Sequence, residues 1–465
     1  MKDMSQDAVI QTIDPTDGSP LQEYPLMETD AAIAGVEACH KAFETWRHET
    51  PAKRAEIIRA IGQALRDHED ELSELMTREM GKLRSQSRTE LQLCAAICDY
   101  TADNGPDELK TEERPYEGGV KGHVAYRPIG VIYGIQPWNF PIYQVVRYSI
   151  ANLMAGNGVL LKHAESVTGC GLRLEELYRE AGLPADLFKV LVIDHDQSDK
   201  VLEHDAVRGV TLTGSPGAGK IIGKKAGAVL KKTVLELGSN DAYIVLEDAD
   251  LEQAVKQCVI GRTFNNGQTC VAAKRFVVVD AVFDAFKEQF VAAMKDMEMV
   301  DPMESEQGLG PMAREDLRDE LHSQVQESIE NGASLLCGGE IPDRDGWWYP
   351  ATVLGDVAPG QPAYDDELFG PAAALIRAKD EEDAMRIAND SRFGLGGAIF
   401  SKDLDRARHL AEMHFDTGMV FINGFSAASP NMPFGGVKNS GYGREHGGFG
   451  MKEFVNVKAI TILNE

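Results

Sequence analysis

The chain has 465 residues, of which 43% are hydrophobic and 26% charged, the composition of an ordinary globular protein of about two to four domains. Asp and Glu number 74 against 47 Lys and Arg, which gives a formal net charge of −27. This charge argues against binding to nucleic acids or anionic membranes, since both depend on clustered Lys and Arg. It predicts a solvated acidic surface, with adaptation to high salt as the alternative.

The seven cysteines predict neither a disulfide framework nor a metal site, because their number is odd and no spacing is that of a zinc site. They are Cys39, Cys94, Cys98, Cys170, Cys258, Cys270 and Cys337. The first residues do not resemble a secretion signal, and no apolar run is long enough to cross a bilayer. We therefore expect a reduced, cytoplasmic protein.

Residues 29–104 are expected to be helical, with Ile57, Ile58, Ile61 and Leu65 at the spacing of one helix face. From about residue 129, short apolar runs alternate with helical patterns, which is typical of parallel sheets covered on both faces. The expected strands are Val131–Ile135, Val159–Leu161, Val190–Ile193, Val210–Leu212, Tyr243–Leu246 and Phe276–Val279. The expected helices include Tyr143–Met154, Gly169–Ala181 and Gly219–Leu230. The sequence thus predicts an α/β fold.

Two segments are expected outside the compact core. Gly105–Gly122 is rich in turn residues and charges, and it predicts a hairpin or connector. Phe454–Leu463 has the pattern of a strand but no obvious partner in the chain, so pairing with another subunit is expected.

Cys270 is the candidate nucleophile. It ends the run Asn266-Gly267-Gln268-Thr269-Cys270, on a loop that enters an apolar element. A catalytic thiol must be reachable and must ionise, and backbone N–H groups or a nearby cation promote ionisation. For this segment alone, a buried structural cysteine is the alternative.

Glu236 and Asn139 also lie beside apolar runs. A buried carboxylate at Glu236 can act as a general base, whereas a solvated loop residue is the alternative. Asn139 lies between Pro137 and Pro141, which fix the turn, and its amide can donate to an oxyanion. A purely structural turn is the alternative there.

Two further strand ends indicate a nucleotide site. The glycine-rich run 213–219 can bring backbone N–H groups to a diphosphate, although it is not the GxGxxG fingerprint and an ordinary tight turn is the alternative. Lys162 and Glu165 follow an earlier strand, at a place where ribose hydroxyls are usually held.

Together these segments resemble the aldehyde dehydrogenase superfamily. The motifs PWNFP, ELGSN, GQTC, ELFGP and PFGGVKNSGYGRE occur in the family's order and at its spacings, over nearly the whole chain. Within the family the chain is similar to bacterial NAD(P)-dependent succinate-semialdehyde dehydrogenases. The resemblance implies a Rossmann-like cofactor domain, an α/β catalytic domain and a small β oligomerisation element.

The resemblance also implies the domain limits. The cofactor domain would comprise residues 1–106 and 128–238, and the catalytic domain residues 239–433. Residues 107–127 and 446–465 would form the oligomerisation element. A homodimer or homotetramer is therefore expected.

The chemistry implied by the resemblance is oxidation of an aldehyde to a carboxylic acid. Cys270 would attack the aldehyde, Asn139 and the Cys270 backbone N–H would hold the oxyanion, and hydride transfer to the nicotinamide would leave a thioester. Glu236 would activate the water that hydrolyses it. The residues implied for the cofactor are Trp138, Lys162, Glu165, Gly214, Ser215, Gly219, Glu367 and Phe369.

Glu165 predicts a preference for NAD over NADP, because a carboxylate accepts hydrogen bonds from ribose hydroxyls and repels a 2′-phosphate. Lys162 and Lys224 or Lys225 can still tolerate that phosphate, so NADP stays possible. His163 replaces the Pro that is more usual at its position in the family.

Arg147 and Ser429 are the candidate substrate residues. Arg147 is the one charge in the apolar stretch 142–155, so it needs an anionic partner, either a protein carboxylate or the substrate's own carboxylate. The succinate-semialdehyde dehydrogenases of the family have an Arg at this position. Many carry a second Arg where this chain has Phe264, which predicts wider acceptance of short aliphatic or aromatic aldehydes. Ser426 is a further residue of the loop that contains Ser429.

Two other functional classes fit the sequence less well. A non-catalytic structural protein of the same fold is opposed by the intact Cys270, Glu236 and Asn139. A cysteine hydrolase fits poorly, because no His lies in the segments around these three residues.

Overall fold

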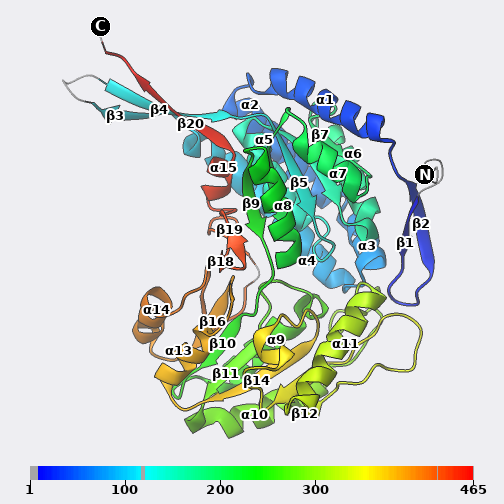
Figure 1. Ribbon diagram of the computed structural model, residues 1–465, viewed down its shortest axis with the longest axis vertical. Helices are drawn as coiled ribbons and strands as arrows, with labels where there is room; N and C mark the ends of the chain where they lie inside the picture. Colours follow the sequence, from blue (N-terminus) through cyan, green and yellow to red (C-terminus); the bar gives the residue numbers. More distant parts are fainter. Residues whose placement is uncertain (1–8, 117–120, 427, 464–465) are drawn as a thin grey trace.

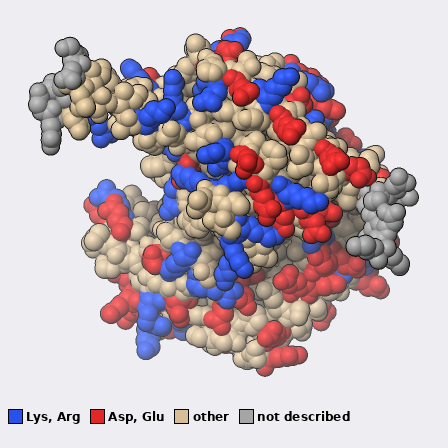
Figure 2. All heavy atoms as spheres, turned by 45° about the horizontal axis from the view of Figure 1, so that its top comes forward, with Lys and Arg blue, Asp and Glu red and all other residues tan. Residues whose placement is uncertain are grey.

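The computed structural model of the chain describes residues 9–116, 121–426 and 428–463, and it contains two large sheets, one above the other in Figure 1. None of the helices in this part of the chain is both long and apolar enough to cross a membrane. Figure 2 shows Asp and Glu side chains spread over one face, with Lys and Arg between them.

The upper sheet has six strands, and all but one are parallel. In spatial order they are β19 (Gly441–Tyr442), β9 (Lys232–Glu236), β8 (Val207–Thr213), β5 (Val131–Gln136), β6 (Gly158–His163) and β7 (Phe188–Val190). The exception is β19, which pairs antiparallel with β9. Apolar side chains on both faces of the central strands are buried, as a parallel sheet requires.

Eight helices that precede or connect these strands belong to the same half of the molecule (Figure 1). They are α1 (Thr29–Trp46), α2 (Pro51–Asp67), α3 (Glu69–Met80), α4 (Arg84–Glu108), α5 (Tyr143–Ala155), α6 (Thr168–Glu180), α7 (His195–Glu203) and α8 (Pro216–Ala228). Local sequence fixes the start of α8, because Ser215 caps it through a hydrogen bond from the Ala218 N–H and Pro216 is its first residue.

The lower sheet has seven strands, and only the β12–β13 pair is antiparallel. In spatial order they are β12 (Ser334–Cys337), β13 (Thr352–Gly355), β14 (Ala372–Ala378), β11 (Arg275–Val279), β10 (Ala242–Val245), β16 (Gly397–Phe400) and β17 (Phe421–Ile422). Its helices are α9 (Leu251–Thr263), α10 (Asp280–Lys295), α11 (Glu315–Glu330), α12 (Pro362–Asp365), α13 (Glu381–Asn389) and α14 (Leu404–Met413).

A three-stranded sheet projects from the upper half (Figure 1). It consists of β20 (Val455–Thr461), β4 (Lys121–Pro128) and β3 (Glu112–Pro115), in that order. The predicted hairpin is therefore present as β3 and β4, and residues 117–120 of that prediction lie outside the described residues. The expectation that the terminal strand has no partner in the chain is wrong, because β20 pairs along its whole length with β4.

The remaining elements are short. They are the hairpin β1 (Val9–Ile13) and β2 (Pro20–Pro25), the pair β15 (Phe393–Gly394) and β18 (Val437–Lys438), the helix α15 (Phe449–Glu453), and the 3₁₀ turns η2 (Glu165–Val167) and η3 (Phe264–Gly267). The predicted strand Val190–Ile193 is misplaced, since β7 already ends at Val190 and the apolar residues after it lie in a loop.

Candidate active site

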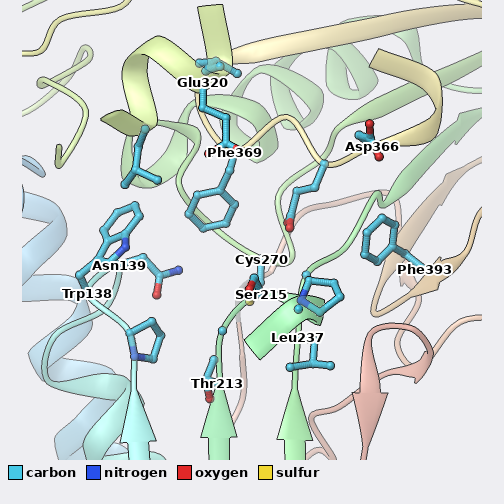
Figure 3. A pocket seen from close by; sticks show the side chains of 18 of the residues that line it. Trp138, Asn139, Thr213, Ser215, Leu237, Cys270, Glu320, Asp366, Phe369 and Phe393 are labelled. Atoms are coloured by element: carbon cyan, nitrogen blue, oxygen red, sulfur yellow. The ribbon is translucent and has the colours of Figure 1, made fainter. Parts of the chain in front are cut away.

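A cavity of about 540 Å³ lies between the two large sheets. One wall consists of residues at the carboxyl ends of the parallel strands β5, β8 and β9, which is where open α/β sheets bind ligands. The opposite wall comes from α11 and the segment before β14 (Figure 3). Its lining includes Trp138, Asn139, Thr213, Gly214, Ser215, Leu237, Cys270, Glu320, Asp366, Glu367, Phe369 and Phe393.

Cys270 lines this cavity and also a second one of about 300 Å³, so the thiol lies where the two meet. Burial raises the pKa of the Cys270 thiol to about 11, while the positive charges of Arg147 and Lys274 act in the opposite direction. The thiol is therefore protonated at neutral pH in this state, and it must lose its proton to a base before it can attack.

The loop that carries Cys270 is held by buried asparagines. Asn265 and Asn266 have φ of 58° and 55°, the left-handed region that Asn tolerates better than most residues. Asn265 donates to the carbonyls of Asn139 (2.9 Å) and Gln268 (3.1 Å), and Asn266 donates to those of Gly81 (3.1 Å) and Pro311 (2.9 Å). The loop is thus tied to both halves of the molecule.

Asn139 faces the large cavity beside Cys270 (Figure 3). Its Nδ2 donates to the Gln268 carbonyl at 3.0 Å, and its Oδ1 accepts from Gln144 Nε2 at 3.2 Å. An amide nitrogen has two N–H groups, so one remains to donate to a ligand oxygen. The geometry therefore brings together the predicted nucleophile and the predicted oxyanion donor.

Glu236, the last residue of β9, lines neither cavity and is 2% exposed. Neither carboxylate oxygen has a hydrogen-bond partner among the described residues, and a Cβ added at Gly435 would lie 2.7 Å from its Oε1. Burial and the negative charge of Glu445 raise the pKa of Glu236 well above its ordinary value. The structure therefore holds the predicted base withdrawn from the thiol, against the backbone of Gly435.

Arg147 lines neither cavity, and its side chain is 1% exposed. It forms an ion pair with Glu445 and donates from Nη2 to Thr213 Oγ1 at 2.9 Å. Burial lowers the pKa of Arg147, but the charges of Glu445 and other neighbours more than offset this effect and raise it. Of the two partners that the sequence allowed, the structure shows the protein carboxylate. Contact of Arg147 with a substrate stays a prediction, since Arg147 lines neither cavity as the structure stands.

Aromatic residues surround the second cavity. Its lining includes Phe140, Tyr143, Phe264, Phe425 and Phe434. The uncharged polar members are Ser426, Thr89, Gln144 and Thr269, and the one charged member is Glu90, which forms an ion pair with Lys82. No Lys or Arg belongs to the lining that the structure describes. Ser429, a predicted substrate residue, does not line this cavity. Its Oγ donates to Asn431 Oδ1 at 2.6 Å. Ser426 is thus the hydroxyl of this loop that reaches the cavity.

Most of the predicted cofactor residues line cavities. Trp138, Gly214, Ser215, Glu367 and Phe369 belong to the large cavity, where Trp138 and Phe369 meet edge to face with ring centroids 5.7 Å apart. Lys162 and Glu165 line a third cavity of about 480 Å³.

Gly219 is the exception, since it lines none of these three cavities. A Cβ on Gly219 would come within 2.5 Å of Leu237, so this glycine lets α8 pack closely on the end of β9. The structure thus shows a packing role for Gly219, and its contact with the cofactor stays a prediction.

The residues around these cavities fit a dinucleotide. At Gly214 and Gly217 an added Cβ would meet no protein atom closer than 3.8 Å, so the space beside the backbone is open to a ligand. That space faces the first turn of α8, where N–H groups attract phosphate. Lys162 is 6% exposed, and its ammonium makes no hydrogen bond to the described residues.

Lys274 is a site residue that the sequence analysis missed. Its side chain is buried and its Nζ donates to the carbonyl of Cys270 at 2.6 Å and to Ser239 Oγ at 2.8 Å. It also forms an ion pair with Glu367 at 3.1 Å. Lys274 thereby links the nucleophile loop to a predicted cofactor residue, and the only sequence signal was a lysine at the end of an apolar run.

His163 replaces the expected Pro and joins two predicted parts of the site. Its Nε2 lies 2.8 Å from the carbonyl of Pro141, and its Nδ1 accepts from the Ala164 N–H at 3.0 Å. Burial lowers the pKa of His163 to about 4, so the ring is neutral, with its proton on Nε2. It anchors the turn that precedes α5 to the end of β6.

Comparison with known proteins agrees with this geometry. The model of the aldehyde dehydrogenase family matches residues 2–460. The chain is 45% identical over 449 residues to a succinate semialdehyde dehydrogenase [NAD(P)+] of Escherichia coli, covering 97% of each chain. It is 42% identical to a succinate-semialdehyde dehydrogenase [NADP(+)] of Deinococcus radiodurans, covering 97% of this chain and 94% of the relative.

A solved structure of a similar protein has the same fold. The crystal structure of succinic semialdehyde dehydrogenase from Streptococcus pyogenes, in complex with NADP+, superposes with a TM-score of 0.95 at 37% identity. The superposition covers 98% of this chain and all of that one.

Proposed function

Because the chain belongs to the aldehyde dehydrogenase family, we propose that it uses NAD(P)+ to oxidise succinate semialdehyde to succinate through Cys270. The observation that carries this proposal is the position of Cys270 between a large cavity that fits a dinucleotide and a smaller one that fits a short aldehyde. The substrate is taken from the names of relatives that are 45% and 42% identical to the chain.

The first step is attack of the Cys270 sulfur on the aldehyde carbon. Its proton passes to a base, and the oxygen of the thiohemiacetal accepts hydrogen bonds from Asn139 Nδ2 and the Cys270 backbone N–H. The nicotinamide, when bound in the large cavity, supplies the acceptor for the hydride. Cys270 is then left as a thioester.

Glu236 completes the reaction by taking a proton from the water that hydrolyses the thioester. A buried carboxylate with a raised pKa is a stronger base than an exposed one, so burial of Glu236 suits this task. The side chain must first turn away from Gly435 towards Cys270, because it lines neither cavity as it stands.

The second cavity would hold the rest of the substrate. With no Lys or Arg in its described lining, and with Glu90 among the lining residues, a distal carboxylate would bind to the Ser426 hydroxyl. The aromatic lining favours a second candidate, the oxidation of neutral aliphatic or aromatic aldehydes.

Initial-rate kinetics separates the two candidates. Succinate semialdehyde and butanal have the same chain length and differ in the carboxylate. A kcat/KM at least about tenfold higher for succinate semialdehyde supports carboxylate recognition, whereas equal values favour the neutral substrates.

We also propose NAD as the preferred cofactor, with NADP accepted. Glu165 is exposed at the rim of the third cavity, where its negative charge would oppose a 2′-phosphate. The ratio of kcat/KM for the two cofactors tests this, and a tenfold preference for NADP would contradict it.

The proposed domain division assigns the cofactor to the upper sheet, catalysis to the lower half and oligomerisation to the projecting sheet. The open edge of β20 exposes Val457 and Ile460, which supports a homodimer or homotetramer. Light scattering of the purified protein measures the oligomer, and a monomer at micromolar concentration would contradict this assignment.

A further inference from the structure

The third cavity contains a cation that comes from the other half of the molecule. Lys162 and Glu165 reach this cavity from the end of β6 and the turn after it. Arg314, the residue before α11, reaches it from the lower half, together with Ala313 and Trp347. The cavity is therefore lined by residues from both sides of the cleft.

We propose that Arg314 binds the 2′-phosphate of NADP and so lets the enzyme use NADP in spite of Glu165. The inference rests on the proposed placement of the adenosine ribose beside Lys162 and Glu165. It makes Arg314, which lies in the other half of the molecule from these two side chains, a residue that determines whether NADP is accepted.

The charges around the cavity support this assignment. No ion pair is found for Glu165 in the described part of the chain. Its carboxylate therefore faces the cavity without a positively charged group in direct contact with it. Arg314 lies close enough for the two charges to interact: a hydrogen bond with Asp316 raises the pKa of Arg314, and the charge of Glu165 raises it further. Arg314 therefore weakens the repulsion that Glu165 alone would exert on a phosphate.

The guanidinium of Arg314 is held by one exposed carboxylate and keeps one nitrogen for a phosphate. Its Nε and Nη2 donate to the two carboxylate oxygens of Asp316 at 2.9 Å and 2.5 Å. The Nη1 group makes no hydrogen bond to the described residues. The side chains of the Arg314–Asp316 pair are 43% and 64% exposed, and exposed pairs are weak enough to rearrange around a doubly charged ligand.

Lys162 supplies the second positive charge. Its ammonium is largely buried and makes no hydrogen bond within the described residues. A phosphate between Lys162 and Arg314 would therefore be bound by one positive charge from each half of the molecule.

The test is the dissociation constant of each cofactor, measured by isothermal titration calorimetry in the absence of aldehyde. Arg314→Ala is expected to weaken NADP+ binding about tenfold and to change NAD+ binding by less than about twofold. Adenosine 2′,5′-bisphosphate, which carries the phosphate without the nicotinamide, is expected to follow NADP+, and 5′-AMP to follow NAD+. Arg408→Ala removes an exposed arginine on α14 and is the matched control, with no change expected for either cofactor.

Two further variants are expected to favour NADP+ binding, the opposite of the effect of Arg314→Ala. Glu165→Gln removes the opposing charge, and Asp316→Asn releases Arg314, so each is expected to strengthen NADP+ binding relative to NAD+. If Arg314→Ala lowers the thermal midpoint, Arg314→Gln is compared in its place. The ratio of the two constants is measured on one sample, which cancels any inactive fraction.

An NADP+ to NAD+ ratio that stays within twofold of the wild type in both Arg314 variants overturns the proposal. Wild-type protein that binds NAD+ but not NADP+ overturns it as well. Failure of the proposed function has a different signature, because an enzyme that oxidises no aldehyde can still show the predicted binding constants.

Discussion

The guanidinium of Arg147 and the carboxylate of Glu445 form a buried ion pair beside Glu236, the proposed base. The rings of Phe434 and Tyr143 lie 4.7 Å and 5.3 Å from the guanidinium carbon, which shields the pair from water. In this position the charge of Arg147 acts on Glu236 and partly offsets the effect of Glu445, so we expect any effect on the substrate to be indirect.

Replacing Arg147 with alanine is therefore expected to destabilise the protein by about 3–5 kcal/mol, because Glu445 is left as an unpaired buried charge. Urea unfolding measures this loss. Among folded molecules, kcat/KM is expected to fall by the same factor for succinate semialdehyde and for butanal. A loss confined to succinate semialdehyde, seen as a higher KM, would show instead that Arg147 binds the substrate carboxylate.

A second prediction concerns the nucleophile. Cys270→Ser is expected to lower aldehyde dehydrogenase activity by more than about a thousandfold, because a serine hydroxyl at this place lacks the nucleophilicity of a thiolate. Cys337→Ser, which changes another partly exposed cysteine far along the chain, is the control and should retain activity. Production of reduced cofactor at a wild-type rate by Cys270→Ser would contradict the mechanism.

A third prediction concerns Glu236 and pH. Since burial and Glu445 raise the pKa of Glu236, the carboxylate form that takes a proton from water becomes populated only as the pH rises beyond the ordinary range of Glu. The wild-type kcat is therefore expected to increase with pH along a limb that Glu236→Gln lacks, with kcat of the variant lower by about 10²–10⁴.

The same variant separates the two halves of the reaction. Glu236→Gln should still form about one equivalent of reduced cofactor per active site in a burst, followed by slow turnover, because thioester hydrolysis is the impaired step. Stopped-flow absorbance measures the burst. An unchanged steady-state rate with an unchanged pH profile would exclude Glu236 as the base.

Much of the fold was predictable from the sequence, and the α/β prediction with a Rossmann-like cofactor sheet is confirmed. Buried parallel strands are continuous apolar runs, so β5, β8 and β11 are recognisable from composition alone. The strand β7 was misplaced because the apolar run continues beyond the sheet into a buried loop. The pairing of β20 with β4 joins residues far apart in the chain, and no local pattern encodes such a contact.

In the site, the motifs predicted which residues come together but not how each side chain is oriented. Cys270 and Asn139 could be singled out from their motifs, whereas the contacts of the Cys270 loop with Gly81 and Pro311 join distant segments and could not. Arg147 could not be resolved, because its partner Glu445 lies in a distant segment. Gly219 is implied for the cofactor by the resemblance, whereas its contact with Leu237 could not be predicted, because it depends on how α8 packs on the sheet.

A fourth prediction concerns stability and comes from a buried carboxylate outside the site. Glu79 on α3 is 1% exposed, and its two oxygens accept the N–H groups of Gly169 and Cys170, each at 3.0 Å, in the first turn of α6. Burial raises the pKa of Glu79 from 4.5 to about 7, although these hydrogen bonds act to lower it.

The sign of the effect follows from proton binding. Between pH 4.5 and about 7 the folded protein keeps the Glu79 proton that the unfolded chain has lost, so the contribution of Glu79 to stability decreases as the pH rises through this window. The full loss is about 3 kcal/mol at 1.36 kcal/mol per pH unit. Urea unfolding at pH 5 and pH 7.5 should therefore show a smaller decline for Glu79→Gln than for the wild type. Glu74→Gln, on the exposed face of the same helix, should decline like the wild type, and equal declines in all three proteins would show that Glu79 is ionised throughout.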